Sequence, residues 1–283
     1  MTAATLTHQP AASIRSDARL TFGRILRSEW IKLTSLRSTV WSLALIAVLG
    51  IGLALMITAL NSTLDGSPAS DPGSVLTTTT IGVAFGQLIA AVLGVLVVSG
   101  EYSTGMIRST LAAVPKRLPV LAAKALVLFT LVTAVGVLTM FGAWAATYPI
   151  LEGQGASVAL TEPGFAVALA GAAVYLGLTA VFALGLGTLL RSAAGGIAAA
   201  LGVILVVPTI LPLVTLAVDW VAEVTPYMLS NAGVAMSRLP DNDSLGAAVG
   251  AGLLEPWVGA LVVLAWAAVA FTLGAIRLKR QDA

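Results

Sequence analysis

Side chains that could carry chemistry are few in this chain, and they form no catalytic pattern. The sequence has a single histidine, His8, and no cysteine, so a nucleophile–histidine pair would have to use the N-terminal region. None of the four lysines follows a glycine, so the phosphate-binding motif G-x-x-x-x-G-K-[ST] is absent. We therefore predict that the chain is not an enzyme and that it binds no metal or cofactor.

One segment gathers charge between two long apolar runs: residues 100–117, GEYSTGMIRSTLAAVPKR. Five of its apolar side chains recur at helical spacing and would share one face: Tyr102, Met106, Ile107, Leu111 and Val114. Pro115 would end such a helix. A short helix of this kind could dock into a cleft of a cytoplasmic partner, burying its apolar face while its charges set the register. The alternative is a connection along the membrane whose basic residues only set orientation.

The elements around this segment follow from the distribution of charge. Of the 283 residues, 58% are hydrophobic and 10% are charged, whereas a soluble domain carries about 25% charged residues. Six intervals without charge are each at least 21 residues long, and a membrane-spanning helix needs roughly 20. We predict an all-α integral membrane protein with six transmembrane helices, near residues 40–60, 76–99, 124–147, 164–190, 194–218 and 257–276.

Basic residues predict the orientation of these spans. Six spans place both termini on one side, and 14 of the 15 basic residues fall on that side, leaving only Arg238 opposite. Nine of the 13 acidic residues fall on the other side. By the excess of Lys and Arg in cytoplasmic loops, both termini and residues 100–117 are expected to be cytoplasmic. The net charge of +2 therefore concerns orientation and does not indicate nucleic acid as a partner.

Segments outside the spans complete the predicted organisation. Residues 1–18 indicate a disordered cytoplasmic tail, and residues 277–283 a second tail, on either side of the six-span domain 39–276. Residues 19–38 predict an amphipathic interfacial helix, with basic residues and an apolar face. That face consists of Phe22, Ile25, Leu26, Trp30, Leu33 and Leu36. The connection from Asp219 to Glu255 holds the uncharged piece SLGAAVGAGLL, too short to span, which predicts a partly re-entrant extracellular segment before the last span.

Within the spans, the sequence offers packing residues and no ionisable group. Every charged residue falls at or beyond a predicted span boundary, which disfavours coupling to protons. Small residues four apart, Gly82/Gly86 and Gly196/Ala200, permit close helix contact. Pro208 and Pro212 predict a kink in the fifth span, which could be a static bend or a hinge.

The order of these features resembles the permease subunits of type-2 ABC exporters, a bacterial family that includes drug- and polysaccharide-export permeases. SEWIKLTSLRSTVW at 28–41 resembles the segment that precedes their first span, and GEYSTGMIRSTL at 100–111 resembles their Gly-Glu-containing coupling segment. PYMLSNAG at 226–233, the last span and the tail IRLKRQDA resemble the last third of the family. The likeness covers nearly all of residues 20–283.

The resemblance implies a multi-pass subunit of the bacterial plasma membrane that is driven by a separate ATP-binding cassette subunit. A second permease copy or a paralogue would complete the complex as a homodimer or heterodimer. A cytoplasmic coupling helix would contact the ATPase through Glu101, Tyr102, Gly105, Met106, Ile107, Arg108, Leu111 and Lys116. The interfacial helix would contribute Glu29, Trp30, Lys32 and Arg37, and Glu101 could pair with Lys32 or Arg37.

Two other functions remain open from the residues alone. A self-contained secondary transporter should show internal repeats, and the two halves of this chain do not match in loop length or motif. A non-transporting membrane assembly protein is the other alternative. A pathway lined by small, apolar and hydroxyl residues, such as Thr77 to Thr80 and Gln87, would suit an apolar or amphipathic cargo rather than a highly charged one.

Overall fold

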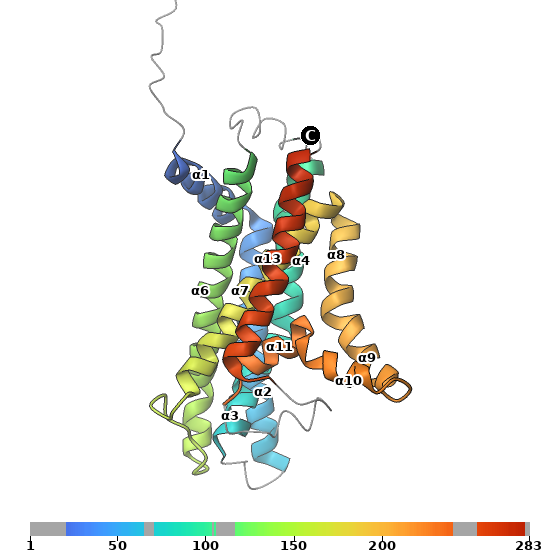
Figure 1. Cartoon of the computed structure of the whole chain (residues 1–283). Helices are drawn as coiled ribbons and strands as arrows, with labels where there is room; N and C mark the ends of the chain where they lie inside the picture. The colour runs from blue at the N-terminus through green and yellow to red at the C-terminus, as the bar shows by residue number, and fades with distance from the viewer. Residues whose placement is uncertain (1–20, 65–70, 104, 106–116, 240–253, 281–283) are drawn as a thin grey trace, which may run out of the picture.

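A computed structural model describes residues 21–64, 71–103, 105, 117–239 and 254–280 of the chain. Within these ranges every regular element is a helix, and the long helices run side by side between two ends of the molecule (Figure 1). Six helices are long and apolar enough to cross a membrane: Arg37–Thr63, Pro72–Tyr102, Leu118–Glu152, Phe165–Leu190, Ala193–Thr215 and Pro256–Arg280. The predicted all-α fold is confirmed for the described residues, and its six long apolar helices are consistent with the predicted multi-pass membrane protein.

Eleven α-helices are described, and two short helices of other types join them. The α-helices are α1 (Phe22–Ser35), α2 (Arg37–Leu64), α3 (Pro72–Thr80), α4 (Val83–Ser103), α6 (Arg117–Glu152), α7 (Phe165–Leu190), α8 (Ala193–Leu201), α9 (Val207–Thr215), α10 (Trp220–Val224), α11 (Leu229–Met236) and α13 (Pro256–Arg280). A π-helix, Gly202–Val206, joins α8 to α9, and a 3-10 turn, Thr225–Tyr227, follows α10.

Helix α7 is the centre of the bundle, packed against α4, α6 and α13. It is apolar on all sides, as expected for a helix buried among others. Small residues bring its neighbours close: Gly185 lies against the backbone of Ala270 in α13, and Ala173 lies against Gly136 in α6. Because apolar side chains gain little by leaving lipid, such close backbone contacts are the main source of helix association in a membrane.

The second span is two helices rather than the single predicted helix over 76–99. A turn at Ile81 and Gly82 separates α3 from α4. Gly82 lies directly against the backbone of Gly50 in α2, where no Cβ would fit. The small pairs of the sequence do serve packing: Gly86 faces Leu176, Gly196 faces Val95, and Ala200 is buried.

The fifth span changes helix type before its prolines. The π-helix Gly202–Val206 ends just before α9, which has Pro208 in its first turn and Pro212 inside it. Proline lacks the N–H that continues an α-helical ladder, and π-turns arise where that ladder is interrupted. No residue of α9 is buried within the chain. This span is therefore the irregular and peripheral one of the six.

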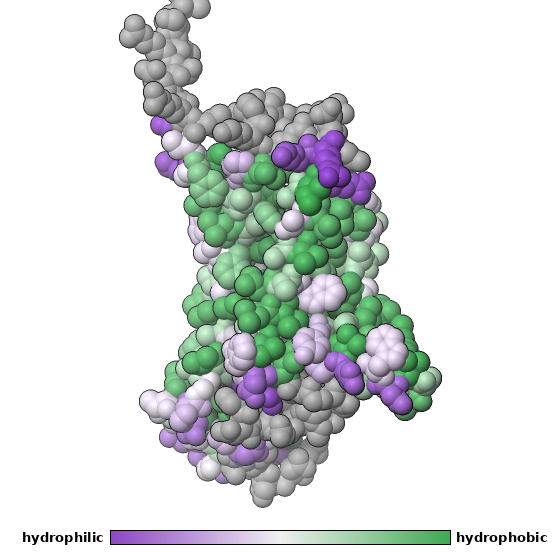
Figure 2. Space-filling view, in the orientation of Figure 1, coloured by the Kyte–Doolittle hydropathy of each residue, from purple (hydrophilic) through white to green (hydrophobic). Residues whose placement is uncertain are grey.

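Both ends of the described chain lie at the same end of the bundle. Helix α1 and the last turn of α13 are found there, whereas α3 and α11 lie in the other half (Figure 1). Figure 2 shows apolar side chains over the middle of this face and polar side chains toward both ends. Helix α13 continues to Arg280, so the tail predicted from residue 277 begins with a helical turn that carries Arg277, Lys279 and Arg280.

The segments on either side of the spans differ in part from the prediction. Helix α1 is shorter than the interfacial helix predicted over 19–38, and Arg37 is the exposed first residue of α2. Residues 1–18 and the piece SLGAAVGAGLL, except Leu254, lie outside the described residues. In the connection before the last span, α11 is only eight residues long and packs against α13 and α7.

Candidate functional site

Four charged side chains from three helices form a closed cluster, which we call the charge cluster: Glu29 and Lys32 of α1, Glu101 of α4 and Lys124 of α6. Lys124 Nζ lies 2.7 Å from Glu29 Oε2 and 2.9 Å from Glu101 Oε1. Lys32 Nζ lies 2.8 Å from Glu29 Oε1 and 3.3 Å from Glu101 Oε1. Each ammonium therefore contacts both carboxylates, and the cluster as a whole is neutral.

Three members of the charge cluster are buried. The side chains of Glu29, Glu101 and Lys124 are 1%, 5% and 4% exposed, and that of Lys32 is 31% exposed. Removing one partner from a buried ion pair costs about 3–5 kcal/mol, because it leaves an uncompensated charge without water. The cluster therefore holds the middle of α1, the end of α4 and the first turns of α6 together only while it is complete.

The α1 members are placed by helical periodicity. Ile25, Glu29 and Leu33 follow one another at four-residue spacing and form the buried face of α1. Three residues of the predicted apolar face are instead exposed within the chain: Phe22, Trp30 and Leu36. Phe22 and Leu36 are therefore exposed at the two ends of α1, and Trp30 is exposed beside the face that packs around Glu29.

Electrostatics keep the α1 members ionised. Burial by itself would raise the pKa of the Glu29 carboxyl, but its ion pairs with Lys124 and Lys32 hold that pKa below the ordinary value. Burial would likewise lower the pKa of the Lys32 ammonium, but the hydrogen bond to Glu29 and the charges of Glu101 and Glu29 hold that pKa above the ordinary value. At neutral pH these groups form fixed ion pairs rather than a proton-exchanging site.

The charge cluster lies next to the predicted coupling segment, where α4 ends before it and α6 begins after it. Glu101 lies two residues before the end of α4, and Lys124 lies two turns after the start of α6 at Arg117. The second carboxylate oxygen of Glu101, Oε2, is buried and has no hydrogen-bond partner among the described residues. Gly105 is exposed with φ 71°, a left-handed conformation that glycine adopts without strain. The predicted Met106, Ile107, Arg108, Leu111 and Lys116 lie outside the described residues.

The structure brings together part of the predicted site and adds Lys124, which the sequence pattern did not mark as a site residue. Of the two partners proposed for Glu101, Lys32 forms the pair. Lys124, the first residue of the predicted span 124–147, was counted only among the basic residues that set orientation, but it lies inside α6 and is the central cation of the cluster. A signal existed: Lys124 is the only charged residue between Arg117 and Glu152.

Tyr102 contributes to the bundle rather than to an open docking face. It is half-buried and packs against the apolar core that includes Leu33, Leu121 and Val98. Arg191, which ends α7 in the left-handed conformation, places its guanidinium carbon 5.5 Å from the centroid of the Tyr102 ring. This cation–π contact ties the end of α4 to the turn between α7 and α8.

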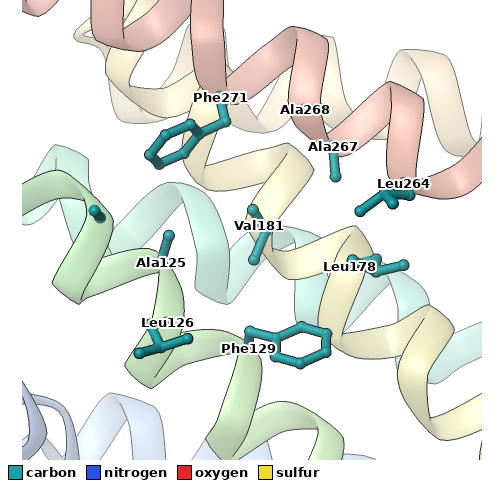
Figure 3. A pocket seen from close by; sticks show the side chains of 10 residues that line it. Ala125, Leu126, Phe129, Leu178, Val181, Leu264, Ala267, Ala268 and Phe271 are labelled. Atoms are coloured by element: carbon teal, nitrogen blue, oxygen red, sulfur yellow. The ribbon is translucent and has the colours of Figure 1, made fainter.

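An apolar groove lies on the side of the bundle, and no polar side chain lines it. It has a volume of about 420 Å³ between α6, α7 and α13, with the Phe129 and Phe271 rings at its edges (Figure 3). Ala125, Leu178 and Ala267 also line it. Side chains of this kind can only pack against another apolar group, such as an acyl chain, and they offer no chemistry.

Neither a metal site nor a relative identifies the chain. Among the residues that the structure describes, no group of three or more His, Cys, Asp or Glu side chains could hold a metal ion. A comparison of the sequence with models of protein families and with curated proteins finds no match.

Proposed function

We propose that the chain is the membrane-spanning permease subunit of an ABC exporter in the bacterial plasma membrane, driven by ATP hydrolysis in a separate ATP-binding subunit. The observation that supports the proposal most directly is the charge cluster, which joins α4 and α6, the helices on either side of residues 104–116, to α1. In this proposal the bundle end that holds α1 and the end of α13 faces the cytoplasm. Residues 104–116 contact the ATPase, and the chain itself needs no cofactor.

A joint of this kind transmits displacement. Glu101 belongs to α4 and Lys124 to α6, the two helices that enter and leave the segment, and both are linked to α1 through Glu29. Separating either carboxylate from Lys124 would cost about 3–5 kcal/mol. A displacement of the segment by the ATPase would therefore move α1, the end of α4 and the start of α6 together. This suits a subunit that is driven by ATP hydrolysis in another chain.

Other features of the chain fit the same proposal. Exposed apolar side chains along α1 and at its C-cap, Phe22, Trp30 and Leu36, suit a helix lying in the cytoplasmic membrane interface. The peripheral α9 exposes Ile210 and Leu213, which suits contact with lipid or with the second permease copy or paralogue. We further propose that residues 219–255 form a partly re-entrant outer segment and that the cargo is an apolar or amphipathic small molecule.

The test is purification of the tagged chain from its native membrane in mild detergent, with every co-purifying chain identified. We expect a stoichiometric ATP-binding subunit. Arg108→Glu, or deletion of residues 103–114, should abolish its recovery because either change alters the docking helix. Lys279→Glu is the matched control, since it makes the same charge change in the last turn of α13 and should leave the complex intact.

Two results would contradict the proposal. Recovery of the chain alone, from membranes in which another ABC complex stays intact, would favour a self-contained secondary transporter. Recovery with membrane proteins that lack an ATP-binding cassette would favour a non-transporting assembly protein. If Arg108→Glu and Lys279→Glu weakened the complex equally, residues 100–117 would have no specific docking role.

A further inference from the structure

A small polar pocket lies in the half of the bundle away from α1. It has a volume of about 260 Å³ and is formed by α3, α4, α7 and α11, at the turn that divides the second span. Its hydroxyl and amide side chains include Thr77, Thr80, Gln87, Ser230, Asn231 and Ser237. We propose that this pocket binds the uncharged, hydrogen-bond-donating head group, a hydroxyl or an amide, of an amphipathic molecule, which gives the cargo of the proposed exporter its chemical class and rests on that function.

The frame of the pocket is rigid. Tyr175 of α7 is fully buried at its wall and donates its hydroxyl proton to Gln87 Oε1 of α4. Gly233 of α11 lies against the Tyr175 ring, where no Cβ would fit. Asn231 is also buried, and its amide donates to the Thr225 carbonyl at 2.8 Å. These contacts fix three of the four helices around the pocket, so its polar groups are held in place before a ligand arrives.

Charge is absent from the lining. Among the described residues that form the pocket, none carries a charged side chain. An ion that left water for this site would lose several kcal/mol of solvation, with no opposite charge to compensate it. The pocket therefore selects against anionic and cationic head groups.

Hydrogen bonds within the helices determine whether the hydroxyl groups of the pocket can donate or only accept a hydrogen bond from a ligand. A hydroxyl has one proton to donate and two lone pairs. Thr77 and Thr80 donate that proton to the Gly73 and Leu76 carbonyls, each at 2.8 Å. Ser237 likewise donates to the Val234 carbonyl at 3.0 Å. These oxygens can then only accept, so a ligand that donates hydrogen bonds fits them best.

One hydroxyl of the lining is left over. Ser230 Oγ is buried and has no hydrogen-bond partner among the described residues. Buried polar groups are nearly always paired, and an unpaired one costs about 1–3 kcal/mol. A hydroxyl or amide group in the pocket would satisfy Ser230 as well as the threonines.

The residues at the opening of the pocket are apolar and exposed, which suits a ligand that has an apolar tail as well as a polar head group. Ile81 and Ala84 line the pocket and are exposed, and Phe85 next to them is 51% exposed. An apolar tail could therefore remain against the membrane-facing side of α4 while the head group enters. The pocket thus divides a ligand into a polar part inside and an apolar part outside.

The experiment uses photoreactive octyl glucoside, with a diazirine in its chain, and the full chain in phosphatidylcholine nanodiscs. Labelled residues are mapped by mass spectrometry. We expect labels in residues 72–103 or 229–236, and we expect octyl trimethylammonium and octyl sulfate probes with the same diazirine to label these ranges weakly. Thr80→Val combined with Ser230→Ala should reduce glucoside labelling about tenfold, because two hydrogen bonds to the head group are lost.

Matched variants separate loss of the site from loss of the fold. Thr80→Ser keeps the hydroxyl and should keep the labelling. Thr130→Val removes an exposed threonine hydroxyl with the same type of bond, to the Leu126 carbonyl at 2.8 Å, but outside the pocket, and should change nothing. Equal labelling by neutral and charged probes, or labelling unaffected by the double variant, would overturn the proposal. Because no ATPase is present, this result is independent of the purification test.

Discussion

The charge cluster and the polar pocket are both polar sites in an apolar bundle, but they differ in how their groups are satisfied. In the charge cluster each ammonium contacts two carboxylates. In the pocket there is no charge in the described lining, and Ser230 Oγ has no partner there. Opposite charges that compensate one another give a joint that resists separation, even though Glu101 Oε2 has no hydrogen-bond partner among the described residues. Uncharged groups with unused hydrogen-bonding capacity can instead bind a ligand. In the proposed exporter, this difference places force transmission at the end that holds α1 and ligand recognition in the other half.

Removing Lys124, the central cation of the charge cluster, should lower the free energy of unfolding more than any other single substitution considered. Lys124→Met leaves Glu29 and Glu101 buried with only the half-exposed Lys32 beside them, so we expect a loss of about 3–5 kcal/mol in the free energy of unfolding. Titration with sodium dodecyl sulfate in mixed micelles, followed by tryptophan fluorescence, measures this quantity. Lys279→Met removes an exposed lysine and should cost little. Equal losses in the two variants would show that the cluster does not hold the helices together.

Exchanging the charges of Glu101 and Lys32 should fail to restore the joint. A lysine at 101 would stand beside Lys124, and a glutamate at 32 beside Glu29, so each new charge repels a neighbour. We expect the double variant to be at least as unstable as the worse single variant and to recover no complex with the ATPase. A double variant more stable than both singles would mean that the Lys32–Glu101 pair acts alone, without the rest of the cluster.

The turn that frames the pocket depends on a close backbone contact. Gly82→Ala would place a methyl group against the Gly50 backbone, and overpacking of this kind costs about 1–3 kcal/mol. We expect the variant to unfold more easily in the same titration and to lose labelling by octyl glucoside, with little change at the charge cluster. Gly52→Ala is the control, because open space surrounds that glycine. An unaffected Gly82→Ala chain would show that α3 can shift without disturbing the pocket.

The outline of the fold could be predicted because charge is so costly in a membrane that its absence marks each span. The same rule hid Lys124, since a single lysine near a span end resembles an orientation signal until Glu29 and Glu101 are seen beside it. The turn at Gly82 depends on Gly50, 32 residues away, and no local pattern reports that contact. Thr77, Thr80 and Gln87 were candidates for a pathway lining, but only the packing of Tyr175 and α11 makes them a pocket.

The pH dependence of stability should distinguish the two sites. The pKa of Glu29 is lowered on folding, so its contribution is present above the unfolded value of about 4.5 and is lost as the pH falls through the folded pKa. The pKa of Lys32 is raised, so its contribution is present below about 10.5 and is lost as the pH rises through the folded pKa. We expect a plateau between these limits, and Glu29→Gln should remove part of the acid loss. Glucoside labelling should not vary across the plateau, because no described group of the pocket lining ionises there; a change near neutral pH would contradict this.

Substitutions of Tyr102 should cause the smallest change in the free energy of unfolding. They test whether the Tyr102 ring stabilises the helix bundle or contacts the partner subunit. Tyr102→Leu keeps apolar volume but loses the cation–π contact with Arg191, worth about 0.5–1 kcal/mol, whereas Tyr102→Phe keeps an aromatic face. We expect Tyr102→Leu to lower the free energy of unfolding by this amount and Tyr102→Phe to change it less. Because the ring is half-buried against the core, both variants should still recover the ATP-binding subunit. Loss of that subunit with unchanged stability would move Tyr102 from the bundle to the docking face and extend the coupling surface back onto α4.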